Sequence, residues 1–173
     1  MESFRMPAMS EEAAVRREVV PMNLLIVDDE QSIRETCATV SEQCGMKAVA
    51  VATAEEALEV LEHSAVDILL TDLKLQQTNG VELLKHVHDV HPEVAVVVLT
   101  QYGTIESAVE VTRIGAVDYV TKPFRIEELR SRLERVARAV ELQQENRLLR
   151  EQLRTRPGFG GTVLSRSPRR RCG

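Results

Sequence analysis

The segment that most constrains the fold of this chain is the unbroken apolar run of residues 94–99, Val-Ala-Val-Val-Val-Leu. A strand with one face in water alternates apolar and polar residues, whereas a continuous run rich in β-branched residues is typical of a strand buried on both faces. Such strands belong to parallel sheets that are covered by helices on each side. The run therefore predicts an α/β fold.

The rest of the chain repeats this unit of strand and helix. Four more short apolar segments predict strands at residues 23–27, 47–51, 67–71 and 117–121. The segments that follow the strands have apolar residues at helical spacing, which predicts helices at residues 32–44, 54–65, 80–91, 105–114 and 125–154. Five such alternations predict a doubly wound α/β sandwich, with a parallel five-stranded sheet of order 2-1-3-4-5 and right-handed crossovers.

The composition narrows the class of protein. A chain of 173 residues with 43% hydrophobic residues suits one globular domain with an appendage, and its net charge of −5 gives no general reason to expect nucleic-acid binding. No apolar run approaches the roughly 20 residues of a membrane-spanning helix. Residues 1–21 lack the apolar core of a signal peptide, and the odd number of cysteines favours reduced thiols. We therefore expect a cytoplasmic protein with a flexible N-terminal extension over residues 1–21.

Polar residues stand directly after four of the predicted strands: Asp28 and Asp29, Asp72, Thr100, and Lys122. In an open α/β sheet the C-terminal ends of parallel strands share one edge, where ligands bind. These side chains are therefore expected to converge. Three carboxylates, a hydroxyl and an ammonium group suit a divalent cation and a phosphoryl group, with Asp72 as the acceptor. The plain alternative is that the carboxylates only cap the loops and helices that follow.

From about Met22 to about Val140 the chain closely resembles the receiver domain of bacterial two-component response regulators. Five pieces in family order and spacing carry this resemblance: Leu25–Glu30, Leu69–Leu73, Thr78–Leu84, Val98–Thr100 and Gly115–Phe124. Within the family, Thr100–Thr104 and Ala116–Tyr119 look most like the NtrC-type activators of sigma-54 polymerase. The resemblance implies a flavodoxin-like (βα)5 fold with a receiver core over residues 22–124.

The resemblance also implies a role for each residue of the acidic group. Asp72 is the expected phosphoacceptor, since carboxylates form aspartyl-phosphate intermediates. Asp29, Asp72 and the backbone carbonyl of Lys74 are the expected protein ligands of Mg²⁺ or Mn²⁺. Asp28 is expected to act on the metal through water, and a role as a helix cap stays open for it.

Three further residues are expected to respond to the phosphoryl group. Lys122 offers a point charge to the oxygens of the phosphoryl group, and Thr100 offers them a hydroxyl group. Tyr119 matches the switch aromatic of the family, which turns inward as the threonine moves; an exposed tyrosine on a strand is the alternative. The Lys122–Pro123 peptide bond is expected to be cis.

The loop after Asp72 departs from the family because residues 73–77 contain no proline, so it is expected to be more mobile. Lys74 and Tyr102 stand where family members tune dephosphorylation. A long side chain at either place can screen the attacking water, so the lifetime of the phosphoryl group stays open.

Residues 125–154 contain neither glycine nor proline and predict a receiver helix that continues into a linker beyond the domain. One apolar stripe is expected to pack on the sheet: Leu129, Leu133, Val136 and Val140. A second stripe has the 4-3-4 spacing of a heptad: Leu142, Asn146, Leu149 and Leu153. This spacing predicts a parallel coiled-coil homodimer, and a single solvated helix is the alternative.

Residues 155–173 are expected to be a disordered tail that resembles the lead-in to the ATPase domain of sigma-54 activators. The chain contains no phosphate-binding loop of the ATPase type. We therefore expect a receiver and not an enzyme in the usual sense. It would take a phosphoryl group on Asp72 from a sensor histidine kinase, with Mg²⁺, and rearrange its dimer to regulate sigma-54-dependent transcription. It would itself bind neither DNA nor a membrane.

Two alternatives to this function remain. One is a dimerisation module with a receiver fold that is never phosphorylated. The other is an aspartyl-phosphate hydrolase. Lys74 argues against the hydrolase, because phosphatases of the haloacid dehalogenase type need an acid two residues after the nucleophile.

Overall fold

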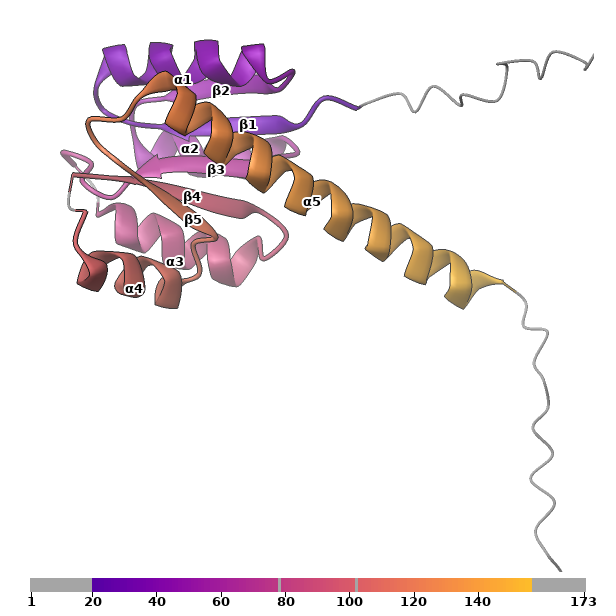
Figure 1. The fold of residues 1–173 in the computed structure, drawn as a ribbon. Helices are drawn as coiled ribbons and strands as arrows, with labels where there is room; N and C mark the ends of the chain where they lie inside the picture. The colour runs from indigo at the N-terminus through magenta and orange to yellow at the C-terminus, as the bar shows by residue number, and fades with distance from the viewer. Residues whose placement is uncertain (1–19, 78, 102, 157–173) are drawn as a thin grey trace, which may run out of the picture.

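The computed structural model describes residues 20–77, 79–101 and 103–156. Strands and helices alternate along the chain as the sequence predicts (Figure 1). The elements are β1 (Asn23–Val27), α1 (Gln31–Gln43), β2 (Lys47–Val51), α2 (Ala54–His63), β3 (Ile68–Asp72), α3 (Gly80–Val90), β4 (Ala95–Thr100), α4 (Ile105–Ile114), β5 (Asp118–Thr121) and α5 (Ile126–Thr155).

The five strands form one parallel sheet in the order β2-β1-β3-β4-β5. This confirms the predicted fold class and strand order. Strand β3 begins and ends one residue later than predicted, so Asp72 is its last residue and pairs with Leu99 of β4. The carboxylate of Asp72 is therefore held by the sheet itself, at the edge where strands β1, β3, β4 and β5 all end.

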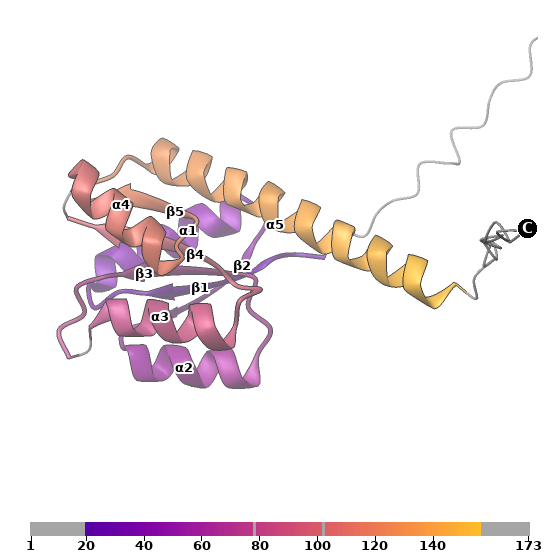
Figure 2. The ribbon, with the colours of Figure 1, turned by 90° about the horizontal axis from the view of Figure 1, so that it is seen from below.

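Two hydrophobic cores fill the two faces of the sheet. Leu24 and Ile26 of β1 pack with α1 and α5, whereas Leu25 and Val27 pack with α2, α3 and α4. Figure 2 shows α1 and α5 on one side of the sheet and α2 and α3 on the other. Successive residues of a strand point to opposite faces, so the continuous apolar runs are explained by burial on both sides.

Side-chain caps and glycines set the ends of several helices. Thr53, Asn79 and Thr104 each accept a hydrogen bond from a backbone N–H in the first turn of α2, α3 and α4. Gly45 and Gly115 follow α1 and α4 with φ of +79° and +114°, a conformation that favours glycine. The predicted start of α2 is confirmed, whereas α1 ends at Gln43, one residue earlier than predicted.

Helix α5 packs on the sheet with its first half and projects from the domain with its second half (Figure 1). Its 30 residues correspond to about 45 Å of helix. Four apolar side chains of the first half are buried, as predicted: Leu129, Leu133, Val136 and Val140. Further along, the Gln144 side chain donates to Asp67 Oδ1 at 2.9 Å, while Asp67 Oδ2 accepts from the Asn23 N–H. Asp67 thus ties the point where α5 leaves the domain to the start of β1.

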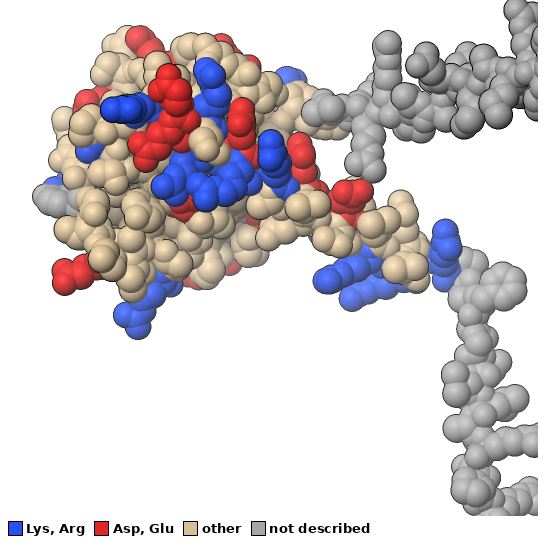
Figure 3. Space-filling model, viewed as in Figure 1, with Lys and Arg blue, Asp and Glu red and all other residues tan. Residues whose placement is uncertain are grey.

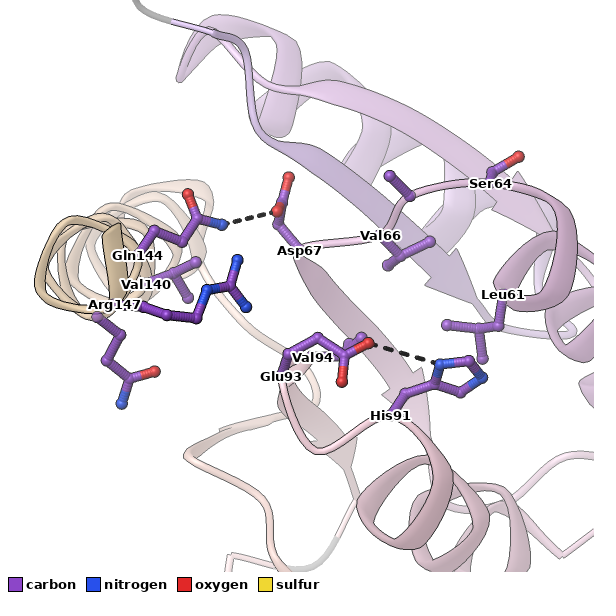
Figure 4. A pocket seen from close by; sticks show the side chains of 12 residues that line it. Leu61, Ser64, Val66, Asp67, His91, Glu93, Val94, Val140, Gln144 and Arg147 are labelled. Carbon is purple, nitrogen blue, oxygen red and sulfur yellow. Dashed lines mark hydrogen bonds and ion pairs between the residues drawn. The ribbon is translucent and has the colours of Figure 1, made fainter. Parts of the chain in front are cut away.

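A hollow of about 360 Å³ lies beside this point (Figure 4). Its walls include the Asp67–Gln144 hydrogen bond and a 3.6 Å contact between His91 and Glu93. Asp67 precedes β3 and Asp72 ends it, so the hollow is separated from Asp72 by the length of the strand, about 16 Å.

Two predicted segments fall mostly outside the part of the chain that the structure describes. These are the N-terminal extension, of which residues 20–21 are described, and the tail, of which residues 155–156 are described. Within the described ranges, no helix is both long enough and apolar enough to cross a membrane.

Candidate functional site

The ends of β1, β3 and β5 bring three side chains that are far apart in sequence into direct contact. The Lys122 Nζ donates to Asp28 Oδ2 at 2.6 Å and to Asp72 Oδ2 at 2.8 Å. Asp28 is fully buried and Asp72 is 3% exposed. Two buried carboxylates would repel each other without a cation between them, and the lysine supplies that cation.

A third carboxylate lies beside this pair. Each of Asp28, Asp29 and Asp72 offers an oxygen, and these oxygens lie within 4.8 Å of one another. Lys122 offsets one of the three negative charges, so the donor set still suits a divalent cation that prefers oxygen ligands. Asp29 is only partly buried, which leaves the cluster open to solvent on its side.

Backbone groups orient the two buried carboxylates. Asp72 Oδ1 accepts from the Lys74 N–H, and Asp28 Oδ1 accepts from the Glu30 N–H, both at 2.9 Å. Both Asp28 oxygens therefore have donors, one from the backbone and one from Lys122. Arg34 Nη1 also donates to the Asp28 carbonyl at 2.8 Å, a contact that the sequence pattern does not reveal.

The environment shifts the pKa of two of these groups. Burial raises the pKa of Asp28 above its ordinary 3.8, and the hydrogen bonds from Lys122 and Glu30 only partly oppose this. Burial acts to lower the pKa of Lys122, but its hydrogen bonds to Asp28 and Asp72 and their charges outweigh it and raise the pKa above 10.5. The lysine is therefore a fixed positive charge at neutral pH.

Gly80 lets helix α3 begin directly against the Asp72 loop. A Cβ at this position would lie 2.7 Å from Leu73 Cα and closer still to the Asp72 carbonyl oxygen. No other residue type fits without displacing the loop. The Asn79-Gly80 dipeptide was part of the sequence motif, but its steric role was visible only in three dimensions.

The predicted switch residues lie on the two neighbouring strands. Thr100 ends β4, is 5% exposed, and accepts a backbone hydrogen bond from the Lys122 N–H at 2.7 Å. Tyr119 of β5 is partly buried against the core on the α2–α4 side, and the Arg132 guanidinium lies 5.9 Å from its ring centroid. The Lys122–Pro123 peptide bond is cis.

The remaining predicted residues are Lys74, Tyr102 and the heptad residues of α5. Lys74 has an exposed side chain although its backbone N–H contacts Asp72, and Tyr102 lies outside the described residues. The heptad residues of α5 are exposed in the single chain, with Leu142, Leu149 and Leu153 at 60%, 52% and 70%. Figure 3 shows basic and acidic side chains intermingled over the domain face in view, the pattern of a solvated surface.

Comparison with known proteins places this geometry in context. The family model of the response regulator receiver domain matches residues 24–134. Regulatory protein AtoC of Escherichia coli is 31% identical over 145 residues, which are 84% of this chain and 31% of AtoC. The crystal structure of NtrX from Brucella abortus has a TM-score of 0.69 at 32% identity, covering 75% of this chain and 30% of NtrX.

A smaller protein matches over nearly its whole length. The chemotaxis response regulator CheY4 of Vibrio cholerae has a TM-score of 0.63 at 27% identity, covering 67% of this chain and 98% of CheY4. The chain therefore spans about a third of the length of AtoC and NtrX but matches nearly the whole of CheY4.

Proposed function

This chain belongs to the response regulator receiver domain family, and from that premise we propose that Asp72 is its phosphoacceptor and a sensor histidine kinase its donor. The observation that carries the proposal is the contact of Lys122 Nζ with both Asp28 and Asp72 beside a third carboxylate. Receiver domains interact with sensor histidine kinases, so the donor is a phosphohistidine.

The transfer joins a carboxylate oxygen of Asp72 to phosphorus as the phosphorus–nitrogen bond of the phosphohistidine breaks. The electron pair of that bond returns to the imidazole nitrogen, and the product on this chain is an acyl phosphate. The hydrogen bonds to Asp72 from Lys74 and Lys122 hold the carboxylate in place before the donor arrives. Such positioning, together with charge stabilisation, supplies most of the catalysis of phosphoryl transfer.

Receiver domains bind Mg²⁺ at an acidic pocket, and the donor set at the ends of β1 and β3 fits that ion. We assign Asp29, Asp72 and the Lys74 carbonyl as its protein ligands and Asp28 as a partner through water. The ion would supply positive charge to the oxygens of the transferring phosphoryl group. Mn²⁺ has similar oxygen preferences and would serve in its place.

Phosphorylation would then move the residues that face the new group. It adds about −1.5 to −2 charges beside Asp72. The Lys122 ammonium group and the Thr100 hydroxyl are the donors that would turn to it, and Tyr119 would follow Thr100 inward. A tenfold change in the ratio of the two states requires only about 1.4 kcal/mol of differential stabilisation.

We assign to helix α5 the change in dimer arrangement that follows phosphorylation. Its exposed leucines at heptad spacing support a parallel homodimer, because burial of Leu142, Leu149 and Leu153 between two helices would remove their apolar surface from water. AtoC and the regulators PilR and FleR of Pseudomonas aeruginosa are similar to this chain. By that likeness we propose regulation of sigma-54-dependent transcription, within a longer protein of this type, as the biological role.

The test uses beryllofluoride with Mg²⁺, a stable analogue of the phosphoryl group, and sedimentation velocity. Wild type should bind the analogue and change its dimer affinity, whereas Asp72→Asn should do neither. Asp89→Asn, an exposed aspartate on α3, is the matched control and should behave as wild type. If wild type gains no phosphoryl mass from acetyl phosphate and ignores beryllofluoride, the phosphoacceptor role is wrong.

A further inference from the structure

A second cluster of charges lies at the other end of strand β5. The Arg132 side chain of α5 donates from Nη1 to Asp118 Oδ1 at 2.6 Å, and Arg135 lies 3.6 Å from Asp118 Oδ2. Asp118 is the first residue of β5 and its Oδ1 also accepts from the Tyr119 N–H. The same Arg132 guanidinium lies 5.9 Å from the centroid of the Tyr119 ring. One arginine therefore contacts both the start of the strand and its aromatic side chain.

The position of β5 makes this arrangement possible. It is an edge strand, so a side chain from α5 can reach around it from one face of the sheet to the other. Tyr119 packs toward the α2–α4 side, whereas α5 covers the opposite face with Leu129 and Leu133. Arg132 is the link between the two faces at this edge.

Ion pairs therefore anchor strand β5 at both ends. Lys122, just past its last residue, contacts Asp28 and Asp72, and Asp118 at its start contacts Arg132. The strand has only four residues, about 13 Å. A displacement of Lys122 at the acidic cluster can therefore reach α5 through one short rigid segment.

Tight packing does not confine the Tyr119 ring. A hollow of about 500 Å³ adjoins it, lined on the α4 side by residues that include Ile105, Val109 and Thr112. Ile105 is 84% exposed and Val109 is 53% exposed, so this side of the ring is open. The side chains of Arg132 and Asp118 are only 29% and 13% exposed, which makes their ion pair stronger than a fully solvated one.

Resting on the phosphoacceptor role proposed above, we propose that Arg132 is a positioning residue that holds Tyr119 at the sheet edge in the unphosphorylated state. Loss of its contacts with the ring and with Asp118 accompanies the inward turn of Tyr119. Because Arg132 belongs to α5, the same step alters the helix that carries the heptad leucines. Arg132 thus opposes the inward turn of Tyr119 in the unphosphorylated state and couples that turn to the projecting part of α5.

The experiment follows the Tyr119 ring directly. The chain has two tyrosines and no tryptophan, so Tyr102→Phe leaves Tyr119 as the single site for 3-fluorotyrosine. Its ¹⁹F resonance is recorded with and without beryllofluoride and Mg²⁺, which defines the resting and switched positions. In this background Arg132→Ala should move the resting resonance toward the switched position. It should also tighten beryllofluoride binding roughly two- to fivefold, the size of one partly exposed cation–π contact.

Two further variants separate positioning from mere stabilisation of the fold. Arg132→Lys keeps a positive charge beside Asp118 but removes the planar guanidinium group from the Tyr119 ring. It should therefore restore part of the wild-type behaviour. Arg138→Ala removes an exposed arginine of the same helix and should change neither quantity. An Arg132→Ala resonance that stays at the wild-type position, with unchanged beryllofluoride affinity, would overturn the proposal.

Failure of the phosphoacceptor role would look different. In that case the wild-type resonance would ignore beryllofluoride, which refutes the proposed function. The resting resonance of Arg132→Ala would still decide the role of Arg132: a shift absent from Arg138→Ala supports positioning of the ring, and no shift contradicts it.

Discussion

Addition of one methyl group at Gly80 should impair phosphorylation of Asp72 more than it impairs folding. The new Cβ would lie 2.7 Å from Leu73 Cα and 2.8 Å from the Leu73 carbonyl oxygen, whereas real Cβ atoms essentially never approach closer than 3.0 Å. The obstructing atoms are backbone atoms, so no side-chain rotation can relieve the overlap. The loop that begins at Asp72 must therefore move.

The size of the effect follows from this geometry. Overpacking of one methyl group typically costs about 1–3 kcal/mol, so Gly80→Ala should lower the free energy of unfolding by that amount. Misplacement of a reacting group by about 1 Å can cost a hundredfold in rate, and the smaller shift required here should cost roughly tenfold. The Asp72 carboxylate should move with the displaced loop, because its Oδ1 accepts a hydrogen bond from the N–H of Lys74 in the same loop.

The assay is the initial rate of mass gain with acetyl phosphate and Mg²⁺, beside urea unfolding of the same samples. Gly45→Ala is the matched control, since its Cβ meets nothing within 4 Å but its φ of +79° strains an alanine by roughly 1 kcal/mol. Gly45 precedes β2 at the opposite sheet edge, so this variant should lose stability and keep its rate. A folded Gly80→Ala protein that is phosphorylated at the wild-type rate, or an equal slowing in Gly45→Ala, would refute the reasoning.

Three other predictions concern charge, pH and assembly. In urea titrations in metal-free buffer, Lys122→Met should lower the free energy of unfolding by about 3 kcal/mol. This is the low end for a broken buried ion pair, because the cluster is open to solvent on one side, and Mg²⁺ should restore part of the lost stability. Burial raises the pKa of the Cys37 thiol to about 12 from 9.0, so the neutral thiol stabilises the fold fully below pH 9 and progressively less as the pH rises to 12. Wild type should therefore lose about 1.4 kcal/mol between pH 8 and pH 10, and Cys37→Ala should show a flatter profile in the same titration. Leu149→Ala should weaken the dimer in sedimentation equilibrium without lowering the stability of the monomer. Leu148→Ala changes a leucine of similar exposure that lies off the heptad stripe, and it should leave the dimer affinity unchanged. Equal weakening by both variants would contradict the heptad assignment.

The sequence predicted the fold because its signals are local and repeated. Residues 94–99 indicated burial on both faces, and the alternation of strands and helices left few ways to arrange a parallel sheet. The largest misplacements concern element ends. Helix α2 ends at His63 and not at residue 65, and β3 is displaced by one residue. Such ends depend on competing hydrogen bonds in the folded state and are weakly marked in sequence.

The candidate site was predictable to the extent that it depends on topology. Parallel strands end at one edge, so Asp28, Asp72, Thr100 and Lys122 had to lie near one another once the strand order was known. The role of Tyr119 could not be decided in this way, because the position of a ring depends on its neighbours and not on its place in the strand.

By itself, then, the sequence determined which residues form the sheet, which edge gathers the carboxylates, and that a long helix leaves the domain with a second apolar stripe. These follow from periodicity and chain connectivity. Only the tertiary structure decided that Lys122 joins both buried aspartates, that Gly80 leaves no room for a side chain, and that Arg132 reaches around β5 to Tyr119. Those contacts join residues far apart in the chain, or depend on how closely two backbones pack. Distances of this kind are set by the packing of whole elements, and no local pattern of residues encodes them.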